Sequence, residues 1–226
     1  MIEAGVFDAG SVNISFNDLG DKYVITTSLA TENMFGMIYP FEAKYEARGL
    51  KLKNGVKPVV YMTEAKSKNH IRTKKIFYDN QGVAYKRVAS KDGKESQKEI
   101  KRMYETADVA DLQTVFAEVF LNWKNSKNCG LEREVYDGKK HYKVIIEDRG
   151  QENRWFDFIK KNEIVNKCAV YIKNLEENND NILWDVSADR PIDVWLGDNN
   201  GDGWPEIYEI NIDKTMVGSI VVYPKN

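Results

Sequence analysis

The residues best suited to chemistry lie in one acidic loop near the end of the chain, from Asp198 to Glu209. Aspartate and asparagine alternate there, a glycine follows, and a glutamate closes the run, which matches the calcium-loop pattern D-x-[DN]-x-[DN]-G-x5-E at every fixed position. Calcium takes about six to eight oxygen ligands, so such a loop must direct several oxygens at one point. The predicted ligands are Asp198, Asn200, Asp202, the carbonyl oxygen of Trp204, Glu206 and Glu209.

The segments beside this loop differ from those of an EF-hand, in which a helix stands on each side. Val194-Trp195-Leu196 is typical of a strand, and after the loop Tyr208, Ile210 and Ile212 alternate with polar residues, as strand residues do. The pattern therefore predicts an EF-like loop between two strands, holding a structural calcium ion. The alternative is a plain hairpin loop, because asparagine, aspartate and glycine are also common turn residues.

Catalytic patterns are poorly represented. The chain has only two histidines, His70 and His141, and neither lies near a G-x-S-x-G motif. The sequence also contains no H-E-x-x-H motif and no glycine-rich phosphate loop. We therefore expect a protein that is not an enzyme.

One amphipathic helix is predicted after a plausible N-cap at Asp108. Apolar residues recur there at steps of three and four, at Val109, Leu112, Phe116, Val119, Phe120 and Trp123. The simplest interpretation is a helix that lies across a sheet and buries its aromatic side chains. The alternative is that Phe116, Phe120 and Trp123 contact a ligand, since pockets often open beside such a helix.

A run of alternate basic residues stands in the first half of the chain, at Lys66, Lys68, His70, Arg72 and Lys74. On one continuous strand these side chains would share a face and could bind an anion or an acidic lipid. A turn at Lys68-Asn69 would scatter them, and the sequence favours that interpretation.

The composition describes a globular chain without a strong charge bias. The 226 residues are 42% hydrophobic and 30% charged, with a net charge of −2, which argues against nucleic-acid binding. No apolar run reaches the length of a transmembrane segment. No signal peptide is visible at the start, so the chain is either cytoplasmic or has had its signal removed. Two cysteines, Cys129 and Cys168, fit either free thiols or a disulfide.

Most of the remaining chain is predicted to form strands. Roughly a dozen short runs of β-branched and aromatic residues are separated by turn residues, at the spacing of an all-β sandwich or barrel. Met37–Arg48 is one predicted strand, and Pro40 within it suggests an edge or a bulge. The polar stretch from Glu95 to Lys101 is predicted to be mobile. Connections are short and no linker stands out, so residues 1–226 are predicted to be a single domain.

The order of these signals resembles the exported bacterial proteins grouped as domain of unknown function 3108. The motifs that carry the resemblance are Tyr23-Val24-Ile25, Met37-Ile38-Tyr39-Pro40, Lys57-Pro58-Val59-Val60-Tyr61, Tyr78-Asp79, Asp111-Leu112-Gln113-Thr114-Val115-Phe116, Tyr136-Asp137-Gly138-Lys139 and Pro191-Ile192-Asp193-Val194-Trp195-Leu196. They extend over most of the chain. Residues 199–203 depart from the shorter loop of the family, so calcium would be a feature of this member rather than one inherited from the family.

The resemblance implies a fold similar to the curved half-barrel of periplasmic lipoprotein carriers, an antiparallel sheet wrapped around one main helix. It also implies an exported, periplasmic protein with a disulfide between Cys129 and Cys168. The expected function is non-enzymatic, with an apolar or lipid-like ligand held in the curved sheet. The alternative is a calcium-stabilised structural or interaction protein of the cell envelope. The family assigns no catalytic residues.

Overall fold

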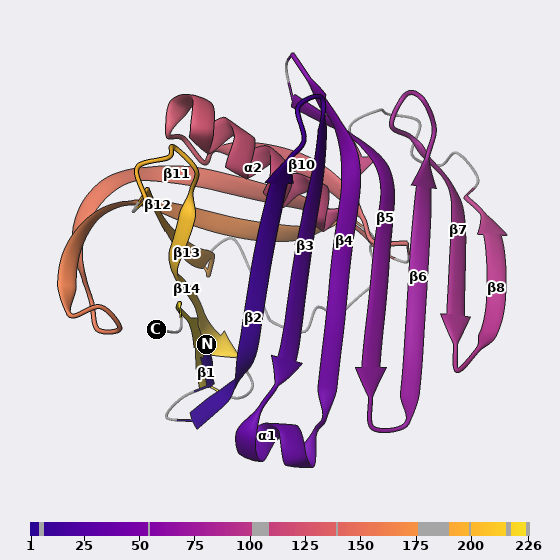
Figure 1. Ribbon diagram of the computed structural model, residues 1–226, viewed down its shortest axis with the longest axis horizontal. Helices are drawn as coiled ribbons and strands as arrows, with labels where there is room; N and C mark the ends of the chain where they lie inside the picture. Colours follow the sequence, from indigo (N-terminus) through magenta and orange to yellow (C-terminus); the bar gives the residue numbers. More distant parts are fainter. Residues whose placement is uncertain are drawn as a thin grey trace. The chain divides into compact units, whose positions relative to one another are not determined.

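The structure is a computed structural model that describes residues 1–4, 7–53, 55–100, 109–138, 140–175, 190–198, 200–215 and 218–224. These residues contain two helices and fifteen strands (Figure 1). The helices are α1 (Asn33–Ile38) and α2 (Leu112–Ser126). The strands are β1 (Ile2–Ala4), β2 (Phe7–Asp18), β3 (Lys22–Thr31), β4 (Phe41–Leu52), β5 (Gly55–Ser67), β6 (His70–Tyr78), β7 (Ala84–Lys91), β8 (Lys94–Glu99), β9 (Val109–Ala110), β10 (Leu131–Tyr136), β11 (His141–Phe156), β12 (Lys161–Asn174), β13 (Ile192–Gly197), β14 (Glu206–Thr215) and β15 (Gly218–Val222).

The chain divides into two compact units, which are described separately. The N-terminal unit comprises Ala9–Glu118 and Arg133–His141. The C-terminal unit comprises Met1–Asp8, Val119–Glu132 and Tyr142–Asn226. Helix α2 begins in the first and ends in the second.

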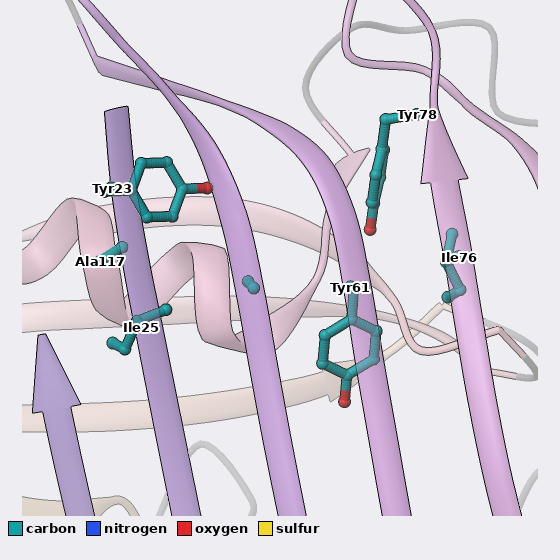
Figure 2. Packing of buried hydrophobic residues seen from close by; sticks show 7 residues of the cluster. Tyr23, Ile25, Tyr61, Ile76, Tyr78 and Ala117 are labelled. Atoms are coloured by element: carbon teal, nitrogen blue, oxygen red, sulfur yellow. The ribbon is translucent and has the colours of Figure 1, made fainter. Parts of the chain in front are cut away.

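The N-terminal unit is an antiparallel ladder in which β2 to β8 pair in the order of the chain. Alternation along the strands gives this ladder two faces of different chemistry. The face that contacts the first turns of α2 is called the inner face here. It carries the buried residues Tyr23, Ile25, Ala47, Tyr61, Ile76 and Tyr78, which pack with Ala117 of α2 (Figure 2).

The opposite, outer face is charged. Glu46 lies between Lys44 and Arg48 there, at 3.6 Å and 2.6 Å, and Glu64 contacts Lys66 at 3.1 Å. These pairs are largely exposed, so each contributes little to stability and mainly keeps the outer face in water.

The C-terminal unit contains a second antiparallel ladder, with the strand order β1-β15-β14-β13-β12-β11. Strands β11 and β12 are long and bend together along their length (Figure 1). A register shift between Asp148 and Gln151, at Gly150 with φ of 84°, marks a bulge in β11. Phe156, Val165, Trp195 and Tyr208 form the buried cluster of this unit.

The predicted fold class is confirmed: the protein is mostly β, with antiparallel pairing, strand curvature and one main helix packed on a sheet. Several boundaries were predicted wrongly. Met37 and Ile38 belong to α1, and β4 starts only after Pro40. Lys94–Glu99 forms the edge strand β8, although its polar sequence predicted mobility. The predicted N-cap at Asp108 lies outside the described residues, and the single domain stays a prediction.

Candidate functional site

The predicted calcium loop lies between β13 and β14, as expected, and a lysine from the end of α2 binds its first residue. The Lys127 ammonium donates to Asp198 Oδ2 at 2.7 Å and to the carbonyl oxygen of Gly203 at 3.1 Å. The hydrogen bond from Lys127 lowers the pKa of the Asp198 carboxyl, helped by the amide of Gly203. An amine from the end of α2 thus neutralises the first residue of the calcium pattern.

Three other predicted ligands, Asn200, Asp202 and Glu206, form hydrogen bonds within the loop that do not involve Lys127. Asp202 Oδ1 accepts the amide hydrogen of Trp204 at 2.9 Å, and Asn200 Nδ2 donates to Glu206. Such local bonds are typical of a turn. The indole ring of Trp204 lies beneath the Lys124 ammonium, 3.9 Å from the ring centre, in a cation–π contact.

Glu209, the predicted bidentate ligand, takes no part in this loop. It lies on β14 opposite Trp195, and its Oε1 accepts from Arg154 Nη2 at 2.7 Å. The Arg154 guanidinium also stacks 3.8 Å from the Trp195 ring centre. Burial raises the pKa of the Glu209 carboxyl, against the lowering effect of Arg154.

The six residues therefore do not form a ligand set in this arrangement. Within the described ranges, no group of three or more histidine, cysteine, aspartate or glutamate side chains is placed to hold a metal ion. The contact of Lys127 with Asp198 and the local hydrogen bonds of the loop are also those expected of the alternative, a plain turn. Calcium binding stays a prediction.

The C-terminal end of α2 is fixed at three further points in the C-terminal unit. Lys127 adopts a left-handed conformation, with φ of 53°, and its amide closes the helix on the carbonyl of Trp123 at 2.7 Å. Asn166 Nδ2 donates to the Lys127 carbonyl at 3.0 Å. Cys129 and Cys168 form a disulfide with a Cα–Cα distance of 6.3 Å, which confirms the predicted bridge.

The aromatic stripe of α2 serves mainly as core. Phe116 packs against the buried cluster of the N-terminal unit. Phe120 is partly buried and Trp123 is 3% exposed, both in the C-terminal unit. The indole Nε1 of Trp123 is buried without an acceptor among the described residues. That nitrogen is a group that a ligand or water oxygen would satisfy, and the ligand role of this stripe stays a prediction.

A buried polar cluster joins the N-terminus of α2 to the inner face, and the sequence did not point to it. Asp111 Oδ1 accepts the amide hydrogen of Thr114 at 2.9 Å, so Asp111 is the N-cap of α2. Its Oδ2 accepts from the Thr114 hydroxyl at 2.8 Å and from the Tyr78 hydroxyl at 3.2 Å. Tyr23 shares a 3.0 Å hydrogen bond with Thr114, and Thr27 donates to Gln113 at 2.9 Å.

Burial controls the titration of this cluster. It raises the pKa of Asp111 to about 6, although the hydrogen bonds from Thr114 and Tyr78 act in the opposite direction. It also raises the pKa of the Tyr23 and Tyr78 phenols, and the charge of Asp111 adds to both shifts. The phenols thus remain neutral donors that hold the helix start on the sheet.

Two basic residues extend the polar contacts of this unit. Arg133 donates to both carboxylate oxygens of Glu118, at 2.9 Å and 2.7 Å, and Glu118 is only 5% exposed. Lys74 donates to the carbonyl of Asp137. Burial lowers the pKa of Lys74, against the attraction of Asp137. Arg72 and Lys74 stand on the inner face with Thr63, whereas Lys66 pairs with Ile71 on the outer face. The turn after Ser67 therefore scatters the alternate basic residues, as the sequence favoured.

The outer face of β2–β5 has a shallow depression of about 560 Å³. Its lining includes the small residues Ser11, Ser28 and Ala30, the apolar residues Val12, Leu29 and Ala43, and a charged rim of Glu42, Lys44 and Lys66. A charged rim on an open surface does not suit an apolar ligand.

The sequence could have indicated the Asp111 cap, because this aspartate directly precedes Leu112, the first apolar residue of α2 itself. Tyr78 contacts Asp111 and Tyr23 contacts Thr114, and both contacts join residues far apart in the chain. No local pattern encodes such contacts. No helix in the described part of the chain is long and apolar enough to cross a membrane.

Comparison with known proteins gives a matching family model and a similar solved structure. The family model described as "Protein of unknown function (DUF3108)" matches residues 1–223. A crystal structure titled "Beta-barrel-like Protein of Domain of Unknown Function DUF1849 from Brucella abortus" is similar with a TM-score of 0.48 and 10% identity, over 96% of this chain and 88% of that chain. No curated protein matches the chain significantly.

Proposed function

We propose, for a chain that belongs to the DUF3108 family of proteins of unknown function, that it binds an apolar or lipid-like ligand on the inner face of its N-terminal unit. The membership confirms the resemblance given by the short sequence motifs. The family description names no activity, so the support for a ligand comes from the surface of the sheet itself.

The observation that carries the proposal is a row of small and apolar side chains beside the part of the inner face that α2 contacts. Val12, Leu29, Ala43 and Ala65 stand directly opposite one another across β2, β3, β4 and β5. Val12, Leu29 and Ala65 are partly exposed, and Ala43 is 5% exposed. An acyl chain laid on these small and apolar side chains would displace water from them.

The next row toward α2 is also suited to an amphiphile. It contains Ile14, Thr27, Tyr45 and Thr63, which again are direct partners across four strands. Burial raises the pKa of the Tyr45 phenol, so this hydroxyl is a neutral donor. An apolar surface with a few fixed polar groups is the usual composition of small-molecule sites.

The titratable groups on this face support binding rather than catalysis. The hydroxyls of Tyr78 and Thr114 both donate to Asp111. The Arg133 guanidinium donates two hydrogen bonds to Glu118. Each of these contacts fixes α2, which is a structural role. A general acid or base would need a reacting atom within hydrogen-bond reach, and these groups already have buried partners.

We also propose that the protein works outside the cytoplasm, in the periplasm. The Cys129–Cys168 disulfide supports this, because such bridges persist mainly in oxidising compartments. The alternative of a calcium-stabilised structural or interaction protein has weaker support, because Lys127 and Arg154 already bind two of the predicted ligands, Asp198 and Glu209.

Native mass spectrometry of protein purified from its own host tests the proposal. We expect an additional mass that is lost when the protein is extracted with organic solvent, and that is identified as a lipid in the extract. Protein that carries no such mass, and that also fails to take up fatty acids or phospholipids offered in solution, would rule out the proposed function.

A further inference from the structure

Helix α1 presents an apolar cluster to solvent at one end of the N-terminal unit. Met34, Met37, Ile38 and Tyr39 are 48%, 80%, 57% and 71% exposed, and no residue of α1 is buried. The cluster lies in the connection between β3 and β4, at the end of the ladder where β5 turns into β6 (Figure 1). Contiguous exposed apolar side chains of this kind are rare on soluble proteins and indicate an interaction site.

The cluster is held in place rather than frayed. The Thr31 hydroxyl donates to the Tyr39 carbonyl at 2.8 Å and accepts from the Phe41 amide at 2.9 Å. The Gly36 amide donates to the Glu32 carbonyl at 2.9 Å. A Cβ at Gly36 would stand 2.9 Å from the Thr31 carbonyl oxygen, so the backbone is tightly folded there. The exposed side chains therefore project from a fixed turn.

Basic residues surround this turn at the same end of the ladder. Register places Phe41 opposite Ser67 and Arg72 opposite Lys91, so the β5–β6 and β7–β8 turns lie on the side of α1. Residues 65–72, at this end, contain the basic residues Lys66, Lys68, His70 and Arg72 and no acidic one. In the β7–β8 turn, Asp92 accepts from the Ile71 amide at 2.9 Å and lies 2.8 Å from His70 Nδ1. Its charge is thus offset locally, while Lys68, Lys91 and Lys94 are exposed.

From this combination we infer that the α1 end of the N-terminal unit docks on an anionic lipid surface. Met37 and Ile38 would enter the boundary between headgroups and acyl chains, Tyr39 would lie at headgroup level, and the lysines would contact lipid phosphates. A second copy of the chain is disfavoured as the partner, because an isologous contact through this end would bring like charges together. The inference goes beyond ligand binding on the inner face and does not require it.

Vesicle flotation tests this inference with the intact protein. We expect binding to phosphatidylcholine vesicles that contain phosphatidylglycerol, and much weaker binding to phosphatidylcholine alone. The double variant Met37→Ser/Ile38→Ser should lower the affinity by roughly tenfold or more, since two apolar side chains no longer leave water. Lys68→Ala should lower it roughly fivefold. Both changes are on exposed side chains, and unchanged thermal melting would verify the fold.

The matched control is Ile164→Ser, which removes another isoleucine side chain, 69% exposed on β12, and should leave vesicle binding unchanged. Equal binding to neutral and anionic vesicles, or an equal loss in the control, would overturn the inference. So would self-association in analytical ultracentrifugation that Met37→Ser abolishes, because the cluster would then pair two copies. Retention of the bound lipid in the double variant separates this surface from the proposed ligand site.

Discussion

The ammonium nitrogen of Lys127 lies 2.7 Å from Asp198 Oδ2 and links the end of α2 to the loop between β13 and β14. The same nitrogen reaches the Gly203 carbonyl at 3.1 Å. A side-chain cation therefore binds one carboxylate, that of Asp198, which the sequence pattern assigns to calcium. A loop neutralised by Lys127 should be equally stable with and without calcium, whereas a calcium-binding loop should be stabilised by added calcium.

Because Lys127 supplies the positive charge, wild-type protein should have the same melting temperature with added calcium and with a chelator. Lys127→Met should lower the melting temperature by a few degrees at most, since the pair with Asp198 is partly exposed. Differential scanning calorimetry in both buffers measures this. Stabilisation of the wild type by calcium, lost in Asp202→Ala, would restore the predicted metal site.

The buried N-cap makes stability depend on pH in an unusual direction. The pKa of Asp111 rises from 3.8 to about 6 on folding, so between these values the folded state binds more protons than the unfolded state. This contribution is fully present below about pH 4 and is lost as the pH rises through about 6, a change of about 3 kcal/mol. Carboxylates whose pKa is lowered on folding change stability with pH in the opposite direction. The contribution of Asp111 must therefore be measured as a difference between the wild type and an Asp111 variant.

Asp111→Asn supplies that comparison, because the amide keeps the oxygen that caps α2 and carries no charge. Relative to the wild type, we expect the variant to gain up to about 3 kcal/mol of unfolding free energy between about pH 4 and pH 7. Urea unfolding at each pH measures the difference. A difference that stays constant with pH would show that Asp111 does not titrate in this range.

The disulfide should account for a large part of stability. Cys129 and Cys168 are 39 residues apart, and a loop of that length corresponds to about 3–4 kcal/mol in the chain-entropy model. We expect Cys129→Ser/Cys168→Ser to melt roughly 10 °C lower than the oxidised protein, and reduction of the wild type to give the same shift. A thiol titration of the unfolded, unreduced protein should find no free thiols. Two free thiols would exclude the bridge.

Neighbouring residues on β5 allow a matched test of the ligand-binding face. Ala65 stands on the inner face opposite Ala43, whereas Glu64 stands on the outer face opposite Lys44. Ala65→Trp should cover part of the row and weaken binding of a fluorescent fatty acid roughly tenfold or more. Glu64→Trp adds the same side chain and should change the affinity by less than about twofold. Equal effects would place the ligand elsewhere.

Local patterns in the sequence were sufficient for the fold class but not for the details of the ends. The spacing of apolar residues located the aromatic stripe of α2. Strand β11 runs from His141 to Phe156 through a polar middle, because a bulge at Gly150 continues the strand. Alternation alone does not distinguish a bulge from a turn.

The candidate site was harder to predict because its contacts are non-local. The Asp198 pattern was recognised, but the partner that neutralises it, Lys127, is 71 residues away. Tyr78 bonds to Asp111 from 33 residues away. The exposed apolar residues of α1 were taken for part of a strand, since Met37 and Ile38 fit strand composition as well as they fit a short helix. The burial of these side chains and the partners that they contact depend on how the strands pair, which a local sequence pattern does not reveal.

The most direct test of ligand binding on the inner face is photoaffinity labelling with a diazirine-bearing fatty acid, followed by peptide mass spectrometry. The proposed site predicts cross-links concentrated on inner-face residues of β2–β5, such as Leu29, Tyr45 and Ala65, and competition by unlabelled fatty acid. Cross-links confined to outer-face residues, or labelling that an excess of unlabelled fatty acid does not reduce, would contradict it.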